Sequence, residues 1–512
     1  MMIKYDIRKN AYYDSVTLML ISKEVKNIEG VTEALVGMGT DLNKELTVNL
    51  KLNNDDLDKI SVNDFYIAAE VDSDETMQAV IDKVNELLSK KKAESGSVYQ
   101  PVSLKMALEM KDDLNLAIVS IPGKYAEEEV HKLLDNDLHV MLFSDNVSIE
   151  AEVALKKKAV GKGLLMMGPD CGTAIINGVP LAFANVVKRG GIGIVGASGT
   201  GTQEVTCLID QLGAGVSQVI GTGGRDLKSQ VGGLMMIQAM KALMDDPMTE
   251  VITLISKPPA PQVAAQILEM VKETDKPVVV DFIGGDQKAI LYAGAYPCST
   301  LEEAARKSVA LLRKEGAEDF IGFDTHENEI GNWIEKGLND LSDKQVNLRG
   351  LYTGGTLADE AMKILGGKIY SNIPLIEAYR LEDLNDLKGH VVLDLGEDQF
   401  TVGRPHPMID PSTRNDHFIS DVDETTAVIL LDVVLGYGSH ENPAKEVADS
   451  VRKLKERLGL NFFIVSSVTG TVDDPQGLNE SRKTLEDEGI IVMPSNAQAV
   501  RLVKMFMEKG GF

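Results

Sequence analysis

From about residue 101 onward, short apolar runs alternate with segments of helical periodicity, and this alternation constrains the fold more than any other feature of the sequence. Apolar runs bounded by glycine and polar residues are typical of buried parallel strands, with helices covering both faces of the sheet. The sequence therefore predicts α/β units built on parallel sheets. The runs interpreted as strands are Leu116–Ile121, Asp137–Phe143, Gly163–Met167, Gly191–Ala197, Val216–Gly221, Val251–Ser256, Pro277–Phe282, Leu348–Tyr352, Val391–Leu395, Ala427–Leu435, Phe462–Ser466 and Ile490–Met493.

The chain divides into four predicted domains at residues 1–99, 100–181, 182–325 and 346–512, with a polar connector at 325–345. In the first domain, apolar runs at Val16–Leu20, Val31–Val36 and Phe65–Val71 are interpreted as strands, and a helix with one apolar face follows from Met77 to Leu88. This order favours a ferredoxin-like (ACT-like) α+β fold. The last two domains are expected to be flavodoxin-like parallel-sheet domains.

Charge and cysteine content limit the partners. A formal net charge of -26 excludes nucleic acid and anionic membrane surfaces, whereas backbone amides can still create a local site for small anionic substrates. Cys171, Cys207 and Cys298 are too widely spaced for a disulfide framework or a zinc site, so no metal is predicted. The polar start of the chain and the short apolar runs favour a cytoplasmic protein.

Three glycine-rich turns follow predicted strands, where ligands of such sheets bind. The candidate anion-binding residues are Ser198, Gly199, Thr200 and Gly201 in the first turn, Gly223 and Gly224 beside Arg225 in the second, and Thr353, Gly354, Gly355 and Thr356 in the third. Small residues, hydroxyls and a helix N-terminus together suit an anion. The alternative is that tight turns simply require glycine. Neither a P-loop nor a dinucleotide fingerprint is present.

Further candidates lie in the last domain. His406 has an intrinsic pKa suited to acid–base catalysis, and the alternative is a surface-loop histidine that shapes its turn. His440 is interpreted as a residue that merely precedes a helix. Asp394, Asp398 and Asp432 are better explained as solvated loop acids than as metal ligands, and Cys171 as a packing residue rather than a nucleophile.

Three motifs in succession carry a family resemblance: Gly168-Pro169-Asp170-Cys171-Gly172, Gly191–Glu204 and Gly221-Thr222-Gly223-Gly224. They resemble the α subunit of succinyl-CoA synthetase over about Pro101–Arg313. The resemblance implies that residues 100–181 are a truncated Rossmann-like CoA-binding-type domain and that 182–325 is ligase-type. It also implies that the helix after Ser198 is one of the "power helices" that hold a phosphorylated histidine in that family, with Glu204 as the glutamate that contacts it.

Two departures from that pattern are evident. The segment Gly284–Ser299 contains no histidine, although the family carries its phosphorylated histidine there. The first strand–turn–helix unit of the CoA-binding domain is also missing, so CoA binding is doubtful. Glu204 has therefore lost its family partner, and it either orients another group or favours the first helical turn as an acid.

The additional N-terminal domain, these losses and the segment Gly403–Pro411 together resemble the FdrA family over nearly the whole chain. The resemblance implies one component of a multi-subunit oxamate carbamoyltransferase. That enzyme converts oxalurate and phosphate to oxamate and carbamoyl phosphate in allantoin breakdown, linked to carbamate kinase. Other subunits and an oligomer are then expected, with Arg225 or Arg404 as the carboxylate clamp and His406 as the acid. An ADP-forming acyl-CoA ligase and a non-catalytic regulatory or scaffold subunit remain as alternatives.

Overall fold

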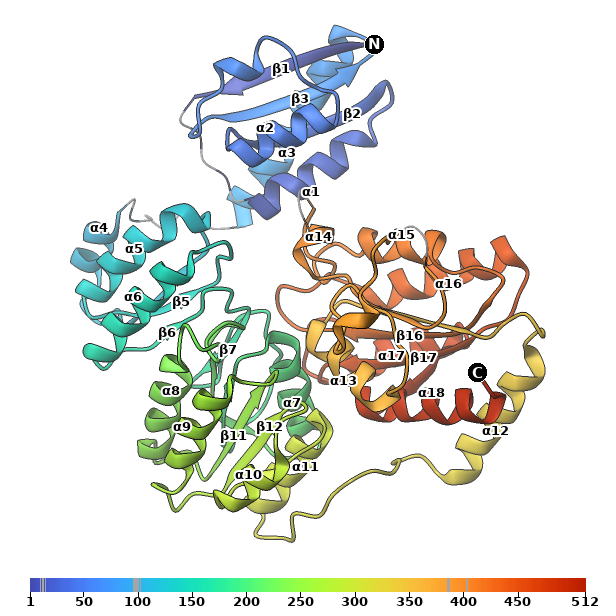
Figure 1. Cartoon of the computed structure of the whole chain (residues 1–512). Coiled ribbons are helices and arrows are strands. Elements are labelled where there is room, and N and C mark those ends of the chain that lie inside the picture. Colours follow the sequence, from blue (N-terminus) through green and yellow to red (C-terminus); the bar gives the residue numbers. More distant parts are fainter. Residues whose placement is uncertain are drawn as a thin grey trace. The chain divides into compact units, whose positions relative to one another are not determined.

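The computed structural model describes the chain except residues 10, 12, 14, 95–100, 102, 385, 386, 402 and 403. It contains two compact units (Figure 1). Unit 1 comprises Met1–Asp112 and Asp398–Pro405, and unit 2 comprises Asp113–Glu397 and His406–Phe512. Within the described residues, none of the helices combines the length and apolar character that a membrane crossing requires.

Unit 1 is built on an antiparallel sheet in the order β1-β3-β2, formed by β1 (Met2–Arg8), β2 (Val31–Met38) and β3 (Phe65–Val71). One face of the sheet packs against helices α1 (Ser15–Lys26) and α3 (Asp74–Glu94). The other face is covered by the segment that contains α2 (Asp41–Asn49) and the short helix η1 (Leu57–Lys59). This arrangement agrees with the predicted small α+β domain.

The run Val16–Leu20, however, is not a strand. It lies in α1, and the first strand is β1, which the sequence analysis did not anticipate. Leu18, Ile21 and Val25 are all buried on one face of this helix. Their spacing of three and four residues is helical, and it outweighs the local preference of valine and threonine for strands.

Unit 2 begins with a parallel three-stranded sheet, β4-β5-β6, and continues with a seven-stranded sheet in the order β13-β12-β11-β9-β10-β7-β8. Strands β9 to β13 run in parallel with the spatial order 2-1-3-4-5 of a flavodoxin-like sheet. The elements are β4 (Leu116–Val119), α5 (Gly123–Asp135), β5 (His139–Leu142), α6 (Ile149–Gly161), β6 (Met166–Met167), β9 (Arg189–Gly196), α7 (Gly199–Gln211), β10 (Val216–Gly221), α8 (Leu234–Asp245), β11 (Val251–Ser256), α9 (Pro261–Val271), β12 (Val278–Phe282), α10 (Gln287–Tyr292), β13 (Tyr296–Pro297) and α11 (Leu301–Leu312), with α4 (Leu104–Met110) preceding them in unit 1.

The third sheet of unit 2 is parallel throughout, in the order β15-β14-β16-β17-β18, which is again 2-1-3-4-5. The two flavodoxin-like predictions are thus confirmed at the level of topology. The elements are β14 (Asn347–Tyr352), α13 (Gly355–Leu365), η2 (Glu377–Tyr379), β15 (Val391–Asp394), α15 (Ser412–Ser420), β16 (Thr426–Val434), α16 (Pro443–Leu458), β17 (Phe463–Thr469), α17 (Leu478–Asp487), β18 (Ile491–Met493) and α18 (Asn496–Gly510); α14 (Asp398–Thr401) belongs to unit 1.

Two segments differ from expectation. The polar connector at 325–345 contains α12 (Glu327–Asp340), whose Ile330 and Ile334 are one helical turn apart and buried. A hairpin of β7 (Thr173–Ile176) and β8 (Val179–Ala182) pairs antiparallel with β10, so the seven-stranded sheet begins before the boundary predicted at 181–182. The hairpin was missed because its two strands have only four residues each.

Candidate functional site

The N-termini of α7 and α13 face each other in unit 2. Each helix follows the first strand of its flavodoxin-like sheet, where ligands of such folds bind. Ser198 caps α7 by accepting a hydrogen bond from the amide of Gly201 at 3.0 Å, and its Oγ lies 2.6 Å from Thr356 Oγ1 of α13. Two of the predicted anion-binding turns are therefore brought together.

Glycine is required where these helices meet. A Cβ on Gly201 would lie 2.8 Å from the Thr356 methyl group, and one on Gly354 would lie 2.9 Å from the side chain of Thr200. Gly199, in contrast, is exposed and has room for a side chain. As the first residues of a helix, Gly199 and Thr200 have no intrahelical acceptor for their amides, so they can receive an anion.

The turn before α13 already binds a carboxylate of the chain itself. Asp432, at β16, accepts hydrogen bonds from the amides of Thr353 and Gly354, each at 2.8 Å, and from the Thr353 hydroxyl. Asp432 is fully buried beside Arg414. The expectation that it is a solvated loop acid is therefore wrong. These two amides are therefore engaged, and an external anion finds its free donors on the α7 side.

Lys257 brings a positive charge to the same edge of the sheets. It directly follows β11 and forms an ion pair of 2.7 Å with Asp359 of α13, while its side chain is 46% exposed. Burial works to lower the pKa of Lys257, but the charge and hydrogen bond of Asp359, together with the charges of Asp394 and Glu397, outweigh it and the pKa is raised. A cation thus stands near the facing helix N-termini.

Asp394, at the end of β15, is also buried rather than solvated. Its Oδ1 accepts from the amide of Gly396 at 2.9 Å, and a Cβ on Gly355 would overlap its Oδ2. Burial, with the neighbouring charge of Glu397, raises the pKa of Asp394 to about 7. Asp398, the third acid considered, is exposed and lies in unit 1.

His406 lies in the same region, with its ring 6.2 Å from that of Phe183 and its Nε2 against Gly396. Its Nδ1 accepts a hydrogen bond from the amide of Met408 at 3.2 Å. The ring thus hydrogen-bonds within its turn, as the alternative interpretation held, but it is buried and not on the surface. Burial lowers the pKa of His406 to about 4. The expectation that an ordinary pKa suits it to acid–base work is therefore wrong.

Glu204 joins the two flavodoxin-like sheets rather than favouring its own helix terminus. It is buried in α7, where it accepts from Thr469 Oγ1 at 2.5 Å and from the amide of Asn496 at the start of α18. Glu360 occupies the corresponding place in α13 and accepts from the amide of Leu301 at the start of α11. Each sheet's first helix therefore binds the N-terminus of the other sheet's last helix.

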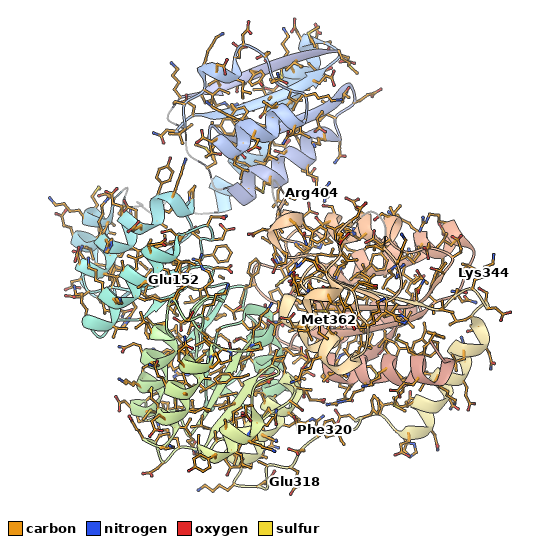
Figure 2. The ribbon with its side chains drawn as sticks, in the orientation of Figure 1. Glu152, Glu318, Phe320, Lys344, Met362 and Arg404 are labelled. Atoms are coloured by element: carbon orange, nitrogen blue, oxygen red, sulfur yellow. The ribbon has the colours of Figure 1, made fainter. Side chains whose placement is uncertain are left out.

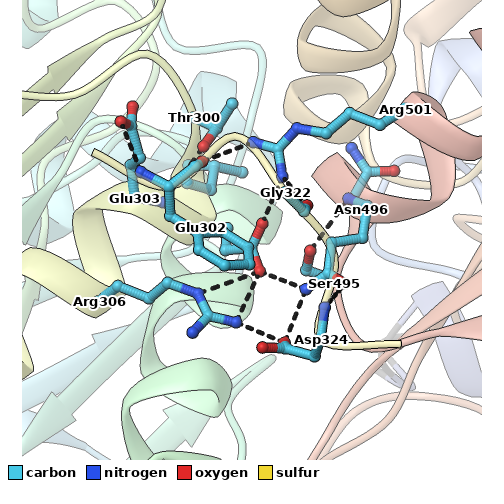
Figure 3. Close-up of polar contacts among 12 residues, drawn as sticks. Thr300, Glu302, Glu303, Arg306, Gly322, Asp324, Ser495, Asn496 and Arg501 are labelled. Atoms are coloured by element: carbon cyan, nitrogen blue, oxygen red, sulfur yellow. Dashed lines mark hydrogen bonds and ion pairs between the residues drawn. The ribbon is translucent and has the colours of Figure 1, made fainter. Parts of the chain in front are cut away.

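A charged network lies beside this junction (Figure 3). Glu302 of α11 contacts Arg306 of its own helix and Gln498 and Arg501 of α18. Asp324 also binds Gln498, at 2.8 Å. A hollow of about 220 Å³ borders Glu302, Arg306 and Asp324. Another of about 230 Å³ borders Lys368, His390 and Lys504. The residues bordering these hollows include none from the facing helix N-termini.

The Gly223–Arg225 turn follows β10, the neighbour of β9 in the sheet, and is engaged in packing. Arg225 donates to the carbonyl of Val147 and pairs with Glu152 at 3.0 Å (Glu152 is labelled in Figure 2). A Cβ on Gly223 would overlap the carbonyl of Pro169, while Gly224 has open space around it. The Arg225 side chain is therefore bound to Glu152 and to the carbonyl of Val147. Arg404 is exposed and belongs to unit 1.

The structure also shows where Cys171 and His440 lie. Cys171 is buried in an apolar cluster, as expected of a packing residue. His440 lies before α16, where its Nδ1 accepts from the amide of the N-cap residue Asn442. Among the described residues, no cluster of three or more His, Cys, Asp or Glu side chains is arranged to hold a metal ion.

Three family models match the chain. The CoA-ligase model matches residues 351–506, the CoA binding domain model matches 187–284, and a model described as "AllF, heavy metal-associated domain" matches 1–102. The CoA binding match falls in the seven-stranded sheet, not in residues 100–181, which the sequence analysis named CoA-binding-type. Topology and matches together describe a mixed α/β protein with segments similar to CoA-ligase and CoA-binding domains.

Comparison with individual proteins identifies the family. The chain is 42% identical over 518 residues to the protein YahF of Escherichia coli (strain K12), covering 100% of this chain and 99% of that protein. It therefore belongs to the family of YahF. It is 27% identical to the α subunit of ADP-forming succinate–CoA ligase of Staphylococcus epidermidis, over 35% of this chain and 61% of that subunit. The ADP-forming sulfoacetate-CoA ligase subunit SauD of Bilophila wadsworthia is 25% identical, over 40% and 71%.

Among solved structures, PH0766 from Pyrococcus horikoshii OT3 matches with a TM-score of 0.35 and 15% identity, over 81% of this chain and 88% of that one. The names of the matched models imply a heavy metal and CoA, and the chain suits these two ligands to different degrees. Residues 1–102 contain neither cysteine nor histidine, so the thiolate and imidazole donors that commonly bind heavy metals are missing. For CoA, the β4–α5 turn packs closely against the next loop at one residue, because a Cβ on Gly123 would overlap the carbonyl of Asp145. The α7 N-terminus remains open to a phosphate group.

The sequence analysis found both helix N-termini but missed Lys257, Asp359 and Glu360. A signal for Glu360 was present, because Gly199-Thr200 and Glu204 have the same spacing as Gly355-Thr356 and Glu360. Lys257 carried no such signal. Its place at the site follows from the neighbouring position of β11 and β9 in the sheet, which the sequence alone does not give.

Proposed function

We propose that the chain is an FdrA-type subunit of an oxamate carbamoyltransferase, which converts oxalurate and phosphate to oxamate and carbamoyl phosphate. The AllF model on residues 1–102 and the CoA-ligase superfamily support an allantoin-related protein on a succinyl-CoA synthetase-like scaffold. The observation that carries the proposal is a pair of facing helix N-termini beside Lys257, in a chain whose segment Gly284–Ser299 has no histidine to phosphorylate.

Direct transfer needs no phosphoenzyme. Phosphate attacks the carbamoyl carbon if an anion site holds it and a cation holds the carboxylate of the oxamate part. The amides of Gly199 and Thr200 supply the anion site, and Ser198 supplies a hydroxyl. Lys257 takes the clamping role first considered for Arg225, because it follows β11 and pairs with Asp359 of α13, whereas Arg225 pairs with Glu152 of α6. A lysine binds a carboxylate as a point charge.

The test is carbamoyl phosphate formation from oxalurate and phosphate, coupled to carbamate kinase, by the chain alone and together with candidate partner subunits. Lys257→Met is expected to raise the KM for oxalurate at least about tenfold, which corresponds to the loss of one charged contact. Arg225→Met is the matched control, and it should lower stability rather than raise KM. Equal KM values in Lys257→Met and the parent chain would remove Lys257 from the site.

An ADP-forming acyl-CoA ligase is the second candidate, and the CoA-ligase and CoA binding matches favour it. This activity predicts binding of CoA and a nucleotide. A ligand that binds only the folded chain stabilises it and so raises the melting temperature of the chain. At a ligand concentration one hundred times the Kd, the stabilisation is about 2.7 kcal/mol. A shift with CoA and none with phosphate plus oxamate would support the ligase, and the reverse pattern would support the transferase.

A further inference from the structure

Asp394 is held in one position at the edge of the candidate site. Its backbone amide donates to Asn372 Oδ1 at 3.0 Å, and Asn372 Nδ2 donates back to its carbonyl at 2.9 Å. Its side chain is 4% exposed, and Oδ1 accepts from the amide of Gly396. The carboxyl group is therefore fixed while its second oxygen is directed at Gly355, the first residue of α13.

The two acids beside this helix differ in how their oxygens are bound. Asp432 receives two backbone amides, the Thr353 hydroxyl and Arg414, so both of its oxygens are engaged. Among the described residues, the Asp394 carboxyl group receives only the amide of Gly396, at Oδ1. Its Oδ2 packs against Gly355 and accepts no hydrogen bond from them, so this oxygen can exchange a proton with a ligand.

The groups around Asp394 come from four segments. Glu397 lies on its own loop, Asp359 on α13, and Lys257 follows β11, and each acts on its charge. His406 Nε2 lies against Gly396 near Asp394 Oδ1, and the ring is neutral, since burial lowers its pKa to about 4. The two acids and the burial favour the protonated form, whereas Lys257 opposes it.

We propose that Asp394 is the catalytic residue that moves the proton in the carbamoyl transfer, an inference that rests on the proposed function. As a hydrogen phosphate oxygen attacks the ureido carbon of oxalurate, the Asp394 carboxylate accepts the phosphate proton. The new C–O bond forms, the C–N bond to the oxamate part breaks, and Asp394 gives the proton to the departing nitrogen. No net proton is released, and no other reactant is needed.

Asp394 suits this step better than the other acidic groups of the site. Its pKa of about 7 allows it both to accept and to donate near neutral pH. His406 has its Nδ1 occupied by the amide of Met408 and is a weak base. Both oxygens of Glu204, and both oxygens of Glu360, already accept hydrogen bonds in the buried junction of the sheets.

The test is Asp394→Asn in the full chain with its partner subunits. Asparagine keeps an oxygen for the Gly396 amide but cannot exchange a proton. We expect kcat to fall at least about 100-fold, the usual contribution of a positioned acid or base. The KM for phosphate should stay within about threefold, and the limb of the pH–rate profile near pH 7 should disappear. The matched control is Asp281→Asn, whose buried carboxyl on β12 makes no hydrogen bond and lies outside the site.

An active parent chain and an Asp394→Asn variant with unchanged kcat and pH profile would overturn the inference while leaving the proposed function intact. If the parent itself forms no carbamoyl phosphate, the proposed function fails. Calorimetry of phosphate binding in two buffers of different ionisation enthalpy then measures the proton exchange on binding, which tests the role of Asp394. Proton exchange that accompanies binding in the parent and is lost in Asp394→Asn supports a proton-exchanging Asp394 beside the phosphate site, without the carbamoyl transfer, and equal proton exchange in both chains rejects this as well.

Discussion

At the scale of single residues, Glu360 makes stability depend on pH. It accepts from the amide of Leu301 at 2.7 Å and from Asn496 Nδ2 at 2.7 Å, and burial raises its pKa to about 7. The folded chain therefore holds this proton to higher pH than the unfolded chain does. The contribution is fully present below pH 4.5, the ordinary value, and is lost as the pH rises through 7.

We predict that Glu360→Gln flattens this dependence. One group contributes about 1.4 kcal/mol per pH unit, hence about 3 kcal/mol between pH 4.5 and 7. Urea unfolding at pH 5 and at pH 7.5 measures this dependence. Between these pH values, the free energy of unfolding of the variant should fall by about 3 kcal/mol less than that of the parent. The exposed Glu273→Gln is the control. An unchanged difference between the two pH values would contradict the assigned cause.

At the scale of elements, the contact between α7 and α13 depends on the absence of a side chain at position 201. We predict that Gly201→Ala destabilises unit 2 by about 1–3 kcal/mol, since its Cβ would lie 2.5 Å from Ser198 Oγ and 2.8 Å from the Thr356 methyl group. This loss exceeds the gain of about 1 kcal/mol that alanine brings to a helix interior. Denaturant unfolding gives both numbers.

Gly331→Ala is the matched control, because Gly331 lies inside α12 with nothing within 4 Å of a new Cβ. It should stabilise the chain by about 1 kcal/mol. If both variants stabilise equally, the helix contact is not tight.

Most strands of unit 2 could be predicted because a buried parallel strand is apolar on both faces. Val216–Gly221 and Val251–Ser256 have the predicted limits. The run Val16–Leu20 was wrongly predicted to be a strand, because five residues are too few to distinguish the period of a helix from that of a strand. The site was found only where glycine turns revealed it. Lys257 and Asp394 join it through strand neighbours and burial, which are tertiary properties.

At the scale of the whole molecule, unit 1 should not respond to heavy metals. The model on residues 1–102 is named for a heavy metal-associated domain, yet this segment has no cysteine or histidine. We predict that zinc and copper(I) leave its melting temperature within about 1 °C, because metal binding to the folded state would raise it. Calorimetric titration of residues 1–112 measures this directly, and micromolar binding at a defined stoichiometry would show that other side chains serve as ligands.

The two flavodoxin-like sheets of unit 2 should lose stability together. Asn496 joins them: its amide binds Glu204, its Nδ2 binds Glu360, and its Oδ1 accepts from Tyr352. Asn496→Ala keeps the amide but removes the three side-chain bonds, to Glu360, to Tyr352 and to the carbonyl of Leu357, and each buried group left without a partner costs about 1–3 kcal/mol. Hydrogen exchange should therefore accelerate at the N-terminus of α11, which Glu360 binds, as well as in α18. Acceleration confined to α18 would mean that the sheets unfold independently and that Glu360 holds α11 without help from Asn496.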